Sequence, residues 1–339
     1  MKPYLVDVPV RVNIWIRPEC QRRQFEVIKQ ARPSIMFLQS DGGRNEKEWE
    51  AIYKNRAIFD NEIDWKCTVY KLYEDHNNGL YTMGRKVSDL IWSTVDRCIF
   101  LEDDYVPSVC FFQYCAELLE KYKDDLRIES ICGMNHLGVC ENVTADYFFS
   151  RQGSIWGTAT WKNRVQARDI QLNYGKDAYV MSLLKQRTRH NPTFWKRIVG
   201  YLKDDHYEGH VPGAEFFREF AMYGYNQLQI IPKYNMINNI GFGNDSTHME
   251  ELKNMPKSLR GIFNMKTYEI TFPLKHADYV IPDVEYEKKR NKIITYNPSP
   301  WLKICRVSES VYCKFINGDR TYLFRRILKM IRGDKCIEK

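Results

Sequence analysis

The sequence lacks any apolar run long enough to cross a membrane. No stretch of its 339 residues approaches the roughly 18 apolar residues that a spanning helix needs. The opening residues, MKPYLVDVPV, lack the basic region and long apolar core of a secretory signal. Internal repeats and low-complexity segments are lacking too, which argues against a solenoid or a disordered chain. We therefore expect a folded cytoplasmic protein.

The ten cysteines lack the spacing of a metal site or a disulfide framework. They are scattered, with no C-x-x-C pair and no histidine at zinc-ligand spacing. Buried free thiols in a reducing compartment are the simpler interpretation. The sequence therefore predicts neither a zinc site nor a disulfide-stabilised fold.

The bulk composition is that of a globular protein with an uneven charge. Hydrophobic residues make up 44% and charged residues 28%, enough for one large domain or a domain with an appendage. The net charge is +8. From Trp301 to Lys339, ten basic residues stand against four acidic ones, so this tail carries +6 of the total.

Strand and helix patterns alternate through the first hundred residues. The expected strands are Val10–Ile16, Ser34–Ser40, Cys67–Tyr73 and Arg97–Glu102, and the expected helices are Pro18–Ala31, Glu46–Ile58 and Leu80–Val95. Parallel strands joined by crossover helices follow, hence an α/β fold with a doubly wound, Rossmann-like sheet flanked by helices. Later, a helix is expected within His210–Tyr225 and a strand at Gln227–Pro232.

Polar side chains follow each expected strand. They are Arg17, then Asp41, then Glu74 and Asp75, and finally the run Glu102–Asp104. In open α/β sheets, ligands bind beyond the carboxyl ends of the strands. The pattern therefore predicts a nucleotide site at this edge of the sheet.

The stretch FLEDDYVPS places three mutually repelling carboxylates, Glu102, Asp103 and Asp104, after a buried strand. A cation would relieve the repulsion, and Mg²⁺ and Mn²⁺ prefer oxygen ligands. The alternative is a solvated acidic turn. We expect a divalent metal that lets these carboxylates approach a nucleotide diphosphate.

Long stretches carry a family resemblance: WIRPECQRRQFEVIKQARPS, SDGGRNEKE, NEIDW, YKLYEDHNNGLYTM, FLEDDYVPS, GTATWK, IPKYNMINNIGFGNDSTH and EITFPLKHADYVIPD. Through them, residues 12–282 resemble bacterial GT-A fold glycosyltransferases often labelled hemolytic-protein-like, although nothing in the sequence supports haemolysis. More remotely, the nucleotide half is similar to N-acetylglucosaminyltransferase I. The resemblance implies a GT-A catalytic domain at 1–282, with a nucleotide-binding half (1–135), an acceptor-binding half (136–282) and a mixed sheet. A basic helical extension (283–339) follows.

The resemblance also implies residue roles. Arg17 and Asp41 would hold the uridine end of the donor, and Asp103 the ribose. Asp104 would bind Mn²⁺ or Mg²⁺ directly, with Glu102 completing the triplet. Glu215, in GAEFFREF, falls where the family has its catalytic aspartate. A carboxylate there suits a general base, although an acid in the first turn of a helix is also favoured by the helix dipole; Asp204 and Asp205 are rival candidates.

Other candidate residues surround the expected donor. Gly241 and Gly243, in NIGFGNDSTH, could offer backbone N–H groups to the diphosphate, and His248 could complete the metal shell or bind phosphate. Arg85, with Lys86, could neutralise phosphate, or simply form a solvated helix face. Trp156 and Trp161 could form an acceptor platform or pack in the core.

The end of the chain, RTYLFRRILKMIRGDK, has an apolar stripe flanked by basic residues. It fits an anionic membrane surface or a helix docked on the catalytic domain.

Together these features predict a metal-dependent hexosyl- or N-acetylhexosaminyltransferase, and the resemblance implies that it is inverting. It would use a nucleotide sugar (a UDP-sugar) and a glycan acceptor, lipid-linked, in surface polysaccharide synthesis. It would act in the cytoplasm, peripherally on the inner face of the cell membrane, with no nucleic-acid partner. One alternative is a sugar nucleotidyltransferase, although RPECQRRQ lacks the glycines which that chemistry uses after the first strand. The other is a non-catalytic glycan- or nucleotide-binding protein.

Overall fold

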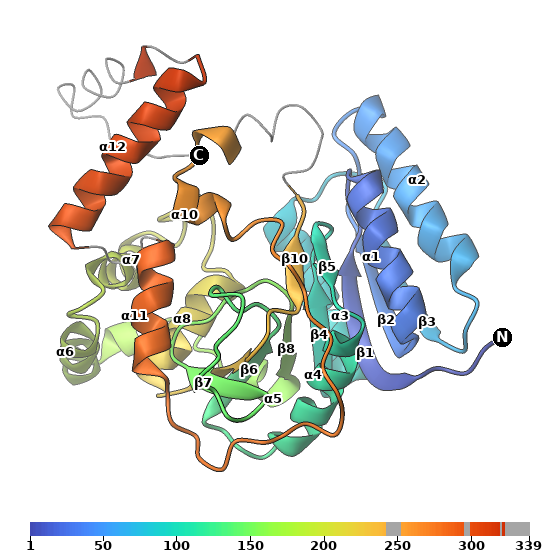
Figure 1. The fold of residues 1–339 in the computed structure, drawn as a ribbon, viewed down its shortest axis with the longest axis horizontal. Helices are drawn as coiled ribbons and strands as arrows, with labels where there is room; N and C mark the ends of the chain where they lie inside the picture. Colours follow the sequence, from blue (N-terminus) through green and yellow to red (C-terminus); the bar gives the residue numbers. More distant parts are fainter. Residues whose placement is uncertain (242–251, 295–298, 319–320, 323–339) are drawn as a thin grey trace.

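The computed structural model describes residues 1–241, 252–294, 299–318 and 321–322, and a mixed eight-stranded sheet lies at its centre (Figure 1). The strand order is β3-β2-β1-β4-β8-β6-β9-β7, and β5 and β10 form a separate two-stranded ribbon. The strands are β1 Val6–Asn13, β2 Pro33–Ser40, β3 Thr68–Tyr73, β4 Arg97–Leu101, β5 Tyr105–Pro107, β6 Ile128–Cys132, β7 Tyr147–Ser150, β8 Thr158–Trp161, β9 Leu228–Pro232 and β10 Ile237–Asn239.

Helices flank this sheet, and several more follow in the second half of the chain. They are α1 Pro18–Ala31, α2 Glu46–Glu62, α3 Leu80–Thr94, α4 Cys110–Lys121, α5 Lys162–Gln166, the 3₁₀ helix η1 Asn173–Lys176, α6 Ala178–Arg187, α7 Pro192–Lys203, α8 Ala214–Gly224, α10 Lys257–Arg260, α11 Val284–Ile293 and α12 Pro300–Ile316. The predicted α/β class, a doubly wound mixed sheet flanked by helices, is confirmed. None of the helices in the described ranges is both long and apolar enough to cross a lipid bilayer.

The first four sheet strands are parallel, as the alternating sequence predicts. β1 pairs with β2 on one side and β4 on the other, and β2 pairs with β3. The first strand was predicted at Val10–Ile16 and lies at Val6–Asn13, so the predicted bounds were wrong. Its parallel register runs from Val6 opposite Pro33 to Asn13 opposite Gln39. The chain leaves the sheet after Asn13, which gives it room to reach α1. All four strands therefore end at the same edge of the sheet.

The two faces of this half are covered by different helices. Val10 of β1 packs in one core with Phe25 of α1 and Phe112 of α4. On the other face, Phe37 of β2 packs with Ile91 of α3. Neighbouring residues of a strand point to opposite faces, so a continuous apolar strand serves both layers.

The second half is less regular. β8 is antiparallel to both of its neighbours, β4 and β6, and separates them. Helices α6, α7 and α8 enclose a smaller core of their own, which includes Phe194, Phe216 and Phe220. Tyr286 of α11, fully buried, belongs to the main core. The division at residue 282 stays a prediction.

Candidate active site at the carboxyl ends of the parallel strands

The three carboxylates that follow β4 do not act as one cluster, because Glu102 has its own partners. Its Oε1 accepts a hydrogen bond from Arg11 Nη2 at 2.9 Å and its Oε2 accepts one from Asn13 Nδ2 at 3.0 Å. Both partners lie on β1. Glu102 therefore ties the end of β4 to β1.

Asp103 and Asp104 share the guanidinium group of Arg17. Arg17 Nη1 donates to both carboxylate oxygens of Asp103, at 2.9 and 2.8 Å, and lies 3.6 Å from Asp104 Oδ2. Arg17 immediately precedes α1, so the start of this helix supplies the counter-charge. The repulsion evident in the sequence is thus partly offset by a cation within the chain.

The electrostatics of this group follow from its burial. Burial raises the pKa of Asp103 to about 7, although Arg17 pulls it down. Burial likewise raises the pKa of Asp104. Burial lowers the pKa of Arg17, the two carboxylates raise it, and the net change is an increase. One guanidinium group therefore does not fully offset two desolvated carboxylates.

Asp104 lies against Gly241. The β5–β10 ribbon brings the two together, and Ile240 N donates to Asp104 O at 3.0 Å. Gly241 N donates to Asn239 Oδ1 at 3.0 Å. A Cβ on Gly241 would collide with Asp104 Oδ2 and lie 2.9 Å from Asp104 Cβ. Only glycine fits here, and it leaves the Asp104 carboxylate partly exposed.

The donor set around Asp104 fits a hard divalent cation. Asp103 and Asp104 supply carboxylate oxygens, which Mg²⁺ and Mn²⁺ prefer, and a side chain at position 241 would collide with the Asp104 carboxylate. Gly243 and His248, the other predicted residues of this loop, lie outside the described residues.

Among the described residues, two groups place three candidate ligand atoms within 4.8 Å of one another, and the run Glu102–Asp104 is not one of them. The two groups are Glu74, Asp75 and His76, and Asp204, Asp205 and His206. Both groups are short sequence-local clusters, and all their members except Glu74 are exposed.

Asp41 organises the loop that follows β3. Its Oδ1 accepts from the backbone N–H groups of Gly42 and Asn78, both at 2.9 Å, and its Oδ2 accepts from Gly79 N at 2.8 Å. The role of Asp41 toward uridine stays a prediction. What the structure shows is a carboxylate that fixes the start of α3, since Gly79 directly precedes that helix.

Arg56 is an organising residue that sequence reasoning missed. Its Nη2 donates to the carbonyl oxygens of Ser40, Asp41 and Glu74, at 3.1, 3.2 and 2.8 Å. The guanidinium also lies over the ring of Tyr73, 4.6 Å from its centroid. Arg56 thus holds the ends of β2 and β3 together. The sequence holds no signal that singles it out, because Arg56 is one of several charged residues of α2.

The two basic residues predicted on α3 differ in their surroundings. Lys86 Nζ lies 2.8 Å from Glu74 Oε1 and 3.2 Å from Asn78 Oδ1, so it is engaged by the loop after β3. Arg85 is exposed. Phosphate binding by Arg85 stays a prediction.

Glu215 lies beside the first turn of α3. It is exposed in the first turn of α8, and its charge contributes, after burial, to raising the pKa of Tyr81. Tyr81 stacks on His210 with ring centroids 4.3 Å apart. Tyr81 follows Gly79 by two residues, so Glu215 belongs to the same edge of the sheet as the Asp41 loop. The rivals, Asp204 and Asp205, are exposed after α7.

A buried ion cluster fixes α8 to the sheet. Glu129 of β6 is 2% exposed. Its Oε1 lies 3.1 Å from Arg168 Nη2, and its Oε2 lies 3.4 Å from Arg218 Nε of α8. Burial raises the pKa of Glu129, but the two guanidinium groups lower it by more than burial raises it. The net pKa is therefore below its usual value. Arg218 lies one turn after Glu215, so this cluster fixes the helix that presents Glu215.

The two tryptophans considered as an acceptor platform are both packed against the protein. Trp161 is buried, and its Nε1 donates to Leu119 O at 2.9 Å. Trp156 is partly buried and contacts Phe263, with centroids 5.1 Å apart. Packing accounts for both rings.

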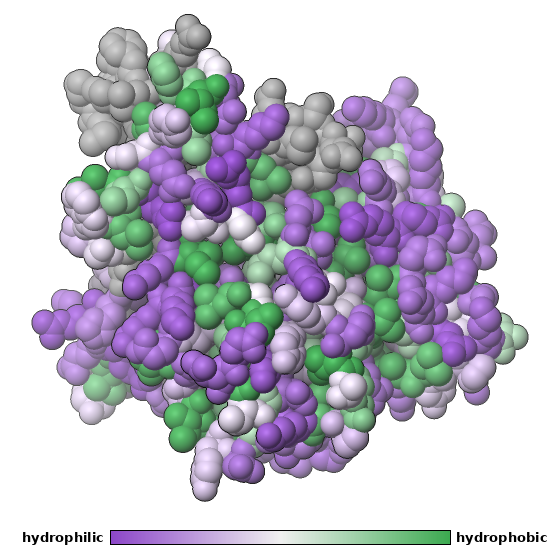
Figure 2. Space-filling view, in the orientation of Figure 1, coloured by the Kyte–Doolittle hydropathy of each residue, from purple (hydrophilic) through white to green (hydrophobic). Residues whose placement is uncertain are grey.

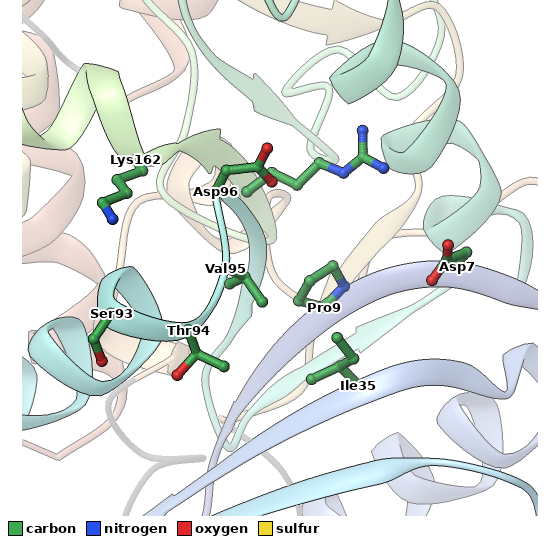
Figure 3. A pocket seen from close by; sticks show the side chains of 9 residues that line it. Asp7, Pro9, Ile35, Ser93, Thr94, Val95, Asp96 and Lys162 are labelled. Atoms are coloured by element: carbon green, nitrogen blue, oxygen red, sulfur yellow. The ribbon is translucent and has the colours of Figure 1, made fainter.

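A surface cavity of about 490 Å³ lies at the opposite end of the strands from these residues. Figure 3 shows it near the start of β1, with Asp7 on one side and Asp96 and Lys162 on the other. Its lining mixes both charge signs. Nucleotides bind at the carboxyl edge of such sheets, so we do not assign the donor to this cavity.

No protein-family model matches the sequence, and no curated protein matches it. Among solved structures, one match is the mannosyltransferase PcManGT from Pyrobaculum calidifontis in complex with GDP-Man and Mn²⁺. It has 10% identity and a TM-score of 0.30, and the match covers 51% of this chain and 49% of that one. Another is the apo-form glycosyltransferase GlyE of Streptococcus pneumoniae TIGR4, with 12% identity, a TM-score of 0.25, and coverage of 67% and 54%. The chain therefore spans about half the length of these two structures. At such scores neither match is evidence for an activity of this protein.

Proposed function

We propose that the protein is a metal-dependent, inverting glycosyltransferase that moves a sugar from a nucleotide sugar, with UDP as the nucleotide, to a glycan acceptor. One observation carries this proposal: Asp103 and Asp104 lie together with Arg17 and Gly241 at the carboxyl edge of the parallel strands. Desolvated carboxylates at that edge suit a ligand that brings its own divalent cation. A hexose or N-acetylhexosamine donor and a lipid-linked acceptor, used in surface polysaccharide synthesis, are part of the proposal.

Each residue has a role in holding the donor. Asp104 holds the cation, which when bound stabilises negative charge on the departing diphosphate. Asp103, fixed by Arg17, accepts hydrogen bonds from ribose hydroxyls. Asp41 keeps the start of α3 in place beside the base of the nucleotide. Gly241 lets the backbone approach Asp104 closely.

Glu215 acts as the general base. In an inverting transfer, an acceptor hydroxyl attacks the anomeric carbon from the side opposite the leaving diphosphate, and a carboxylate removes the hydroxyl proton. The exposed position of Glu215 gives an acceptor access to it. The Glu129 cluster keeps α8 from shifting, which matters because small misplacements of a reacting group are costly in rate.

Donor binding tests the first part of the proposal. A thermal-shift screen of nucleotide sugars with Mn²⁺ identifies the donor, because a ligand that binds only the folded state stabilises it by mass action. Calorimetry with UDP and Mn²⁺ should then show that Asp104→Ala abolishes metal-dependent binding. The matched control is Asp89→Ala, which removes an exposed carboxylate on α3. Unchanged binding by Asp104→Ala would remove its ligand role.

Turnover tests the base. Glu215→Gln should keep donor binding while transfer falls by about 10²–10⁴-fold. Asp204→Asn and Asp205→Asn should transfer at the normal rate. If one of these variants lost activity while Glu215→Gln kept it, the base would lie in the turn after α7. A donor-binding protein with no transfer or donor hydrolysis, with Mn²⁺ and varied acceptors, would be a non-catalytic binder.

A further inference from the structure

Helix α12 has two faces with opposite surroundings. It spans Pro300–Ile316 and lies at the edge of the molecule, away from the central sheet (Figure 1). At 100° per residue, positions three or four apart share a face. Arg306, Glu309, Cys313 and Asn317 follow that spacing and define one face, which we call the docked face.

Contacts of the docked face attach α12 to the rest of the protein. Glu309 Oε1 accepts from Lys257 N of α10 at 2.8 Å, and Asn317 Nδ2 donates to Lys253 O at 3.0 Å. Cys313 is buried there. The helix therefore has a defined orientation, and its other side is turned outward.

The outward side of α12 is apolar. Its large side chains are all more than half exposed, and Figure 2 shows apolar surface in this region, beside residues drawn in grey. These side chains are Trp301, Ile304, Tyr312 and Phe315. Spacings of three, eight and three residues keep Trp301, Ile304, Tyr312 and Phe315 within one side of the helix, opposite the docked face. Exposed apolar residues gathered on one side of a helix indicate an interaction surface.

The charge around the apolar face selects its partner. Lys303 and Lys314 lie between the docked and the apolar face on one flank; Lys303 is exposed, whereas Lys314 is partly buried and its Nζ lies 3.7 Å from the ring centroid of Tyr322. In the sequence, residues 323–339 add six basic residues against two acidic ones. A second copy of the chain, seated face to face on α12, would bring two such basic flanks together, which like-charge repulsion opposes. An anionic surface would instead be attracted.

We propose that the apolar face of α12 binds an anionic lipid surface. Apolar and aromatic side chains enter the boundary between headgroups and acyl chains, and the exposed Lys303 contacts lipid phosphates. The surface differs from the segment RTYLFRRILKMIRGDK, residues 320–335, for which the sequence alone predicts membrane contact. Most of that segment lies outside the described residues. The inference concerns adsorption alone and does not depend on the donor chemistry.

Co-sedimentation of the full chain with lipid vesicles tests the proposal. The wild type should pellet with vesicles of phosphatidylcholine and phosphatidylglycerol, and less with phosphatidylcholine alone. Trp301→Ser with Phe315→Ser should weaken the vesicle partition coefficient at least about tenfold, because two large apolar side chains no longer enter the lipid. Lys303→Gln should weaken it about fivefold on the anionic vesicles only.

A matched pair elsewhere separates this effect from general stickiness. Ile170→Ser with Tyr179→Ser alters two side chains that are 72% and 71% exposed, close to the 74% of Trp301. This control should pellet like the wild type, and all variants should keep the wild-type circular dichroism spectrum and melting temperature.

Three results would overturn the proposal. The first is equal pelleting by the wild type and the Trp301/Phe315 variant. The second is binding with no dependence on anionic lipid or on Lys303. The third is absence of pelleting together with a dimer in size-exclusion chromatography that the Trp301/Phe315 variant dissociates, which would assign the face to a second copy. No outcome alters the donor-binding test, because that test contains no lipid.

Discussion

Replacing Gly241 by alanine is the sharpest perturbation of the candidate site. The added Cβ would collide with Asp104 Oδ2 and lie 2.9 Å from Asp104 Cβ and 3.1 Å from Asp104 Cγ. The carboxylate tip can rotate away, but Asp104 Cβ is fixed by the backbone. The hydrogen bonds from Ile240 N to Asp104 O and from Gly241 N to Asn239 Oδ1 resist a shift of either strand.

The cost of this overlap has two parts. Forcing an extra carbon into a packed position costs about 1–3 kcal/mol of folding free energy. The displaced Asp104 carboxylate no longer holds the cation in its place. By analogy with residues that orient metal ligands, affinity should fall about 10–100-fold. We therefore expect Gly241→Ala to bind Mn²⁺ with UDP much more weakly and to unfold at lower urea concentration.

Gly84→Ala is the matched control. Gly84 lies within α3, and a Cβ there meets no atom within 4 Å. Because alanine favours the helix, this variant should be about 0.5–1 kcal/mol more stable and should bind as the wild type does. Calorimetry and urea unfolding measure both effects. If Gly241→Ala matched the wild type in affinity and stability, the close packing of Gly241 on Asp104 would be refuted.

Two further predictions concern stability. Glu129→Ala should lower the free energy of unfolding by about 3–5 kcal/mol, because it leaves the guanidinium groups of Arg168 and Arg218 buried without their carboxylate. Glu120→Ala, which removes two ion pairs of an exposed carboxylate, with Arg97 and Lys123, should cost under about 1 kcal/mol in the same urea titration. Equal losses would contradict a structural role for the buried cluster. Burial lowers the pKa of His136 well below 6.5. Below pH 6.5 the unfolded chain therefore takes up a proton that the folded chain does not. The free energy of unfolding should decrease there as the pH is lowered, by up to about 1.4 kcal/mol per pH unit. His136→Gln should show a shallower pH dependence of its melting temperature, and parallel curves would exclude this residue as the cause.

The regular half of the fold could be predicted because its local signals agree. Pro18 at the start of α1 and the apolar spacing after it place that helix at its observed bounds, Pro18–Ala31. β8 could not be placed in the same way. Its four residues, Thr158–Trp161, are too few for a visible period, and its antiparallel position depends on long-range pairing, such as Trp161 with Arg97.

The candidate site could be located from the sequence, but its internal pairing could not. Strand ends align in a parallel sheet, which placed the acids at one edge. The bond from Arg17 to Asp103 joins residues 86 positions apart, and the packing of Gly241 on Asp104 depends on the β5–β10 ribbon. Such contacts are set by register and crossing geometry, which no local pattern of residue types records.

Because the guanidinium of Arg17 already lies beside Asp104, a metal ion can bind there only by taking over part of its place. A divalent ion that reaches Asp104 competes with a cation already tethered to the protein, at 3.6 Å from the same carboxylate oxygen. Selectivity then depends on the difference in free energy between two cations, and dilute monovalent ions gain little by replacing a guanidinium. An ion delivered with a diphosphate brings ligands of its own and can tip that balance. In the proposed enzyme, the tethered arginine would therefore discriminate between a bare ion and an ion that arrives with its nucleotide.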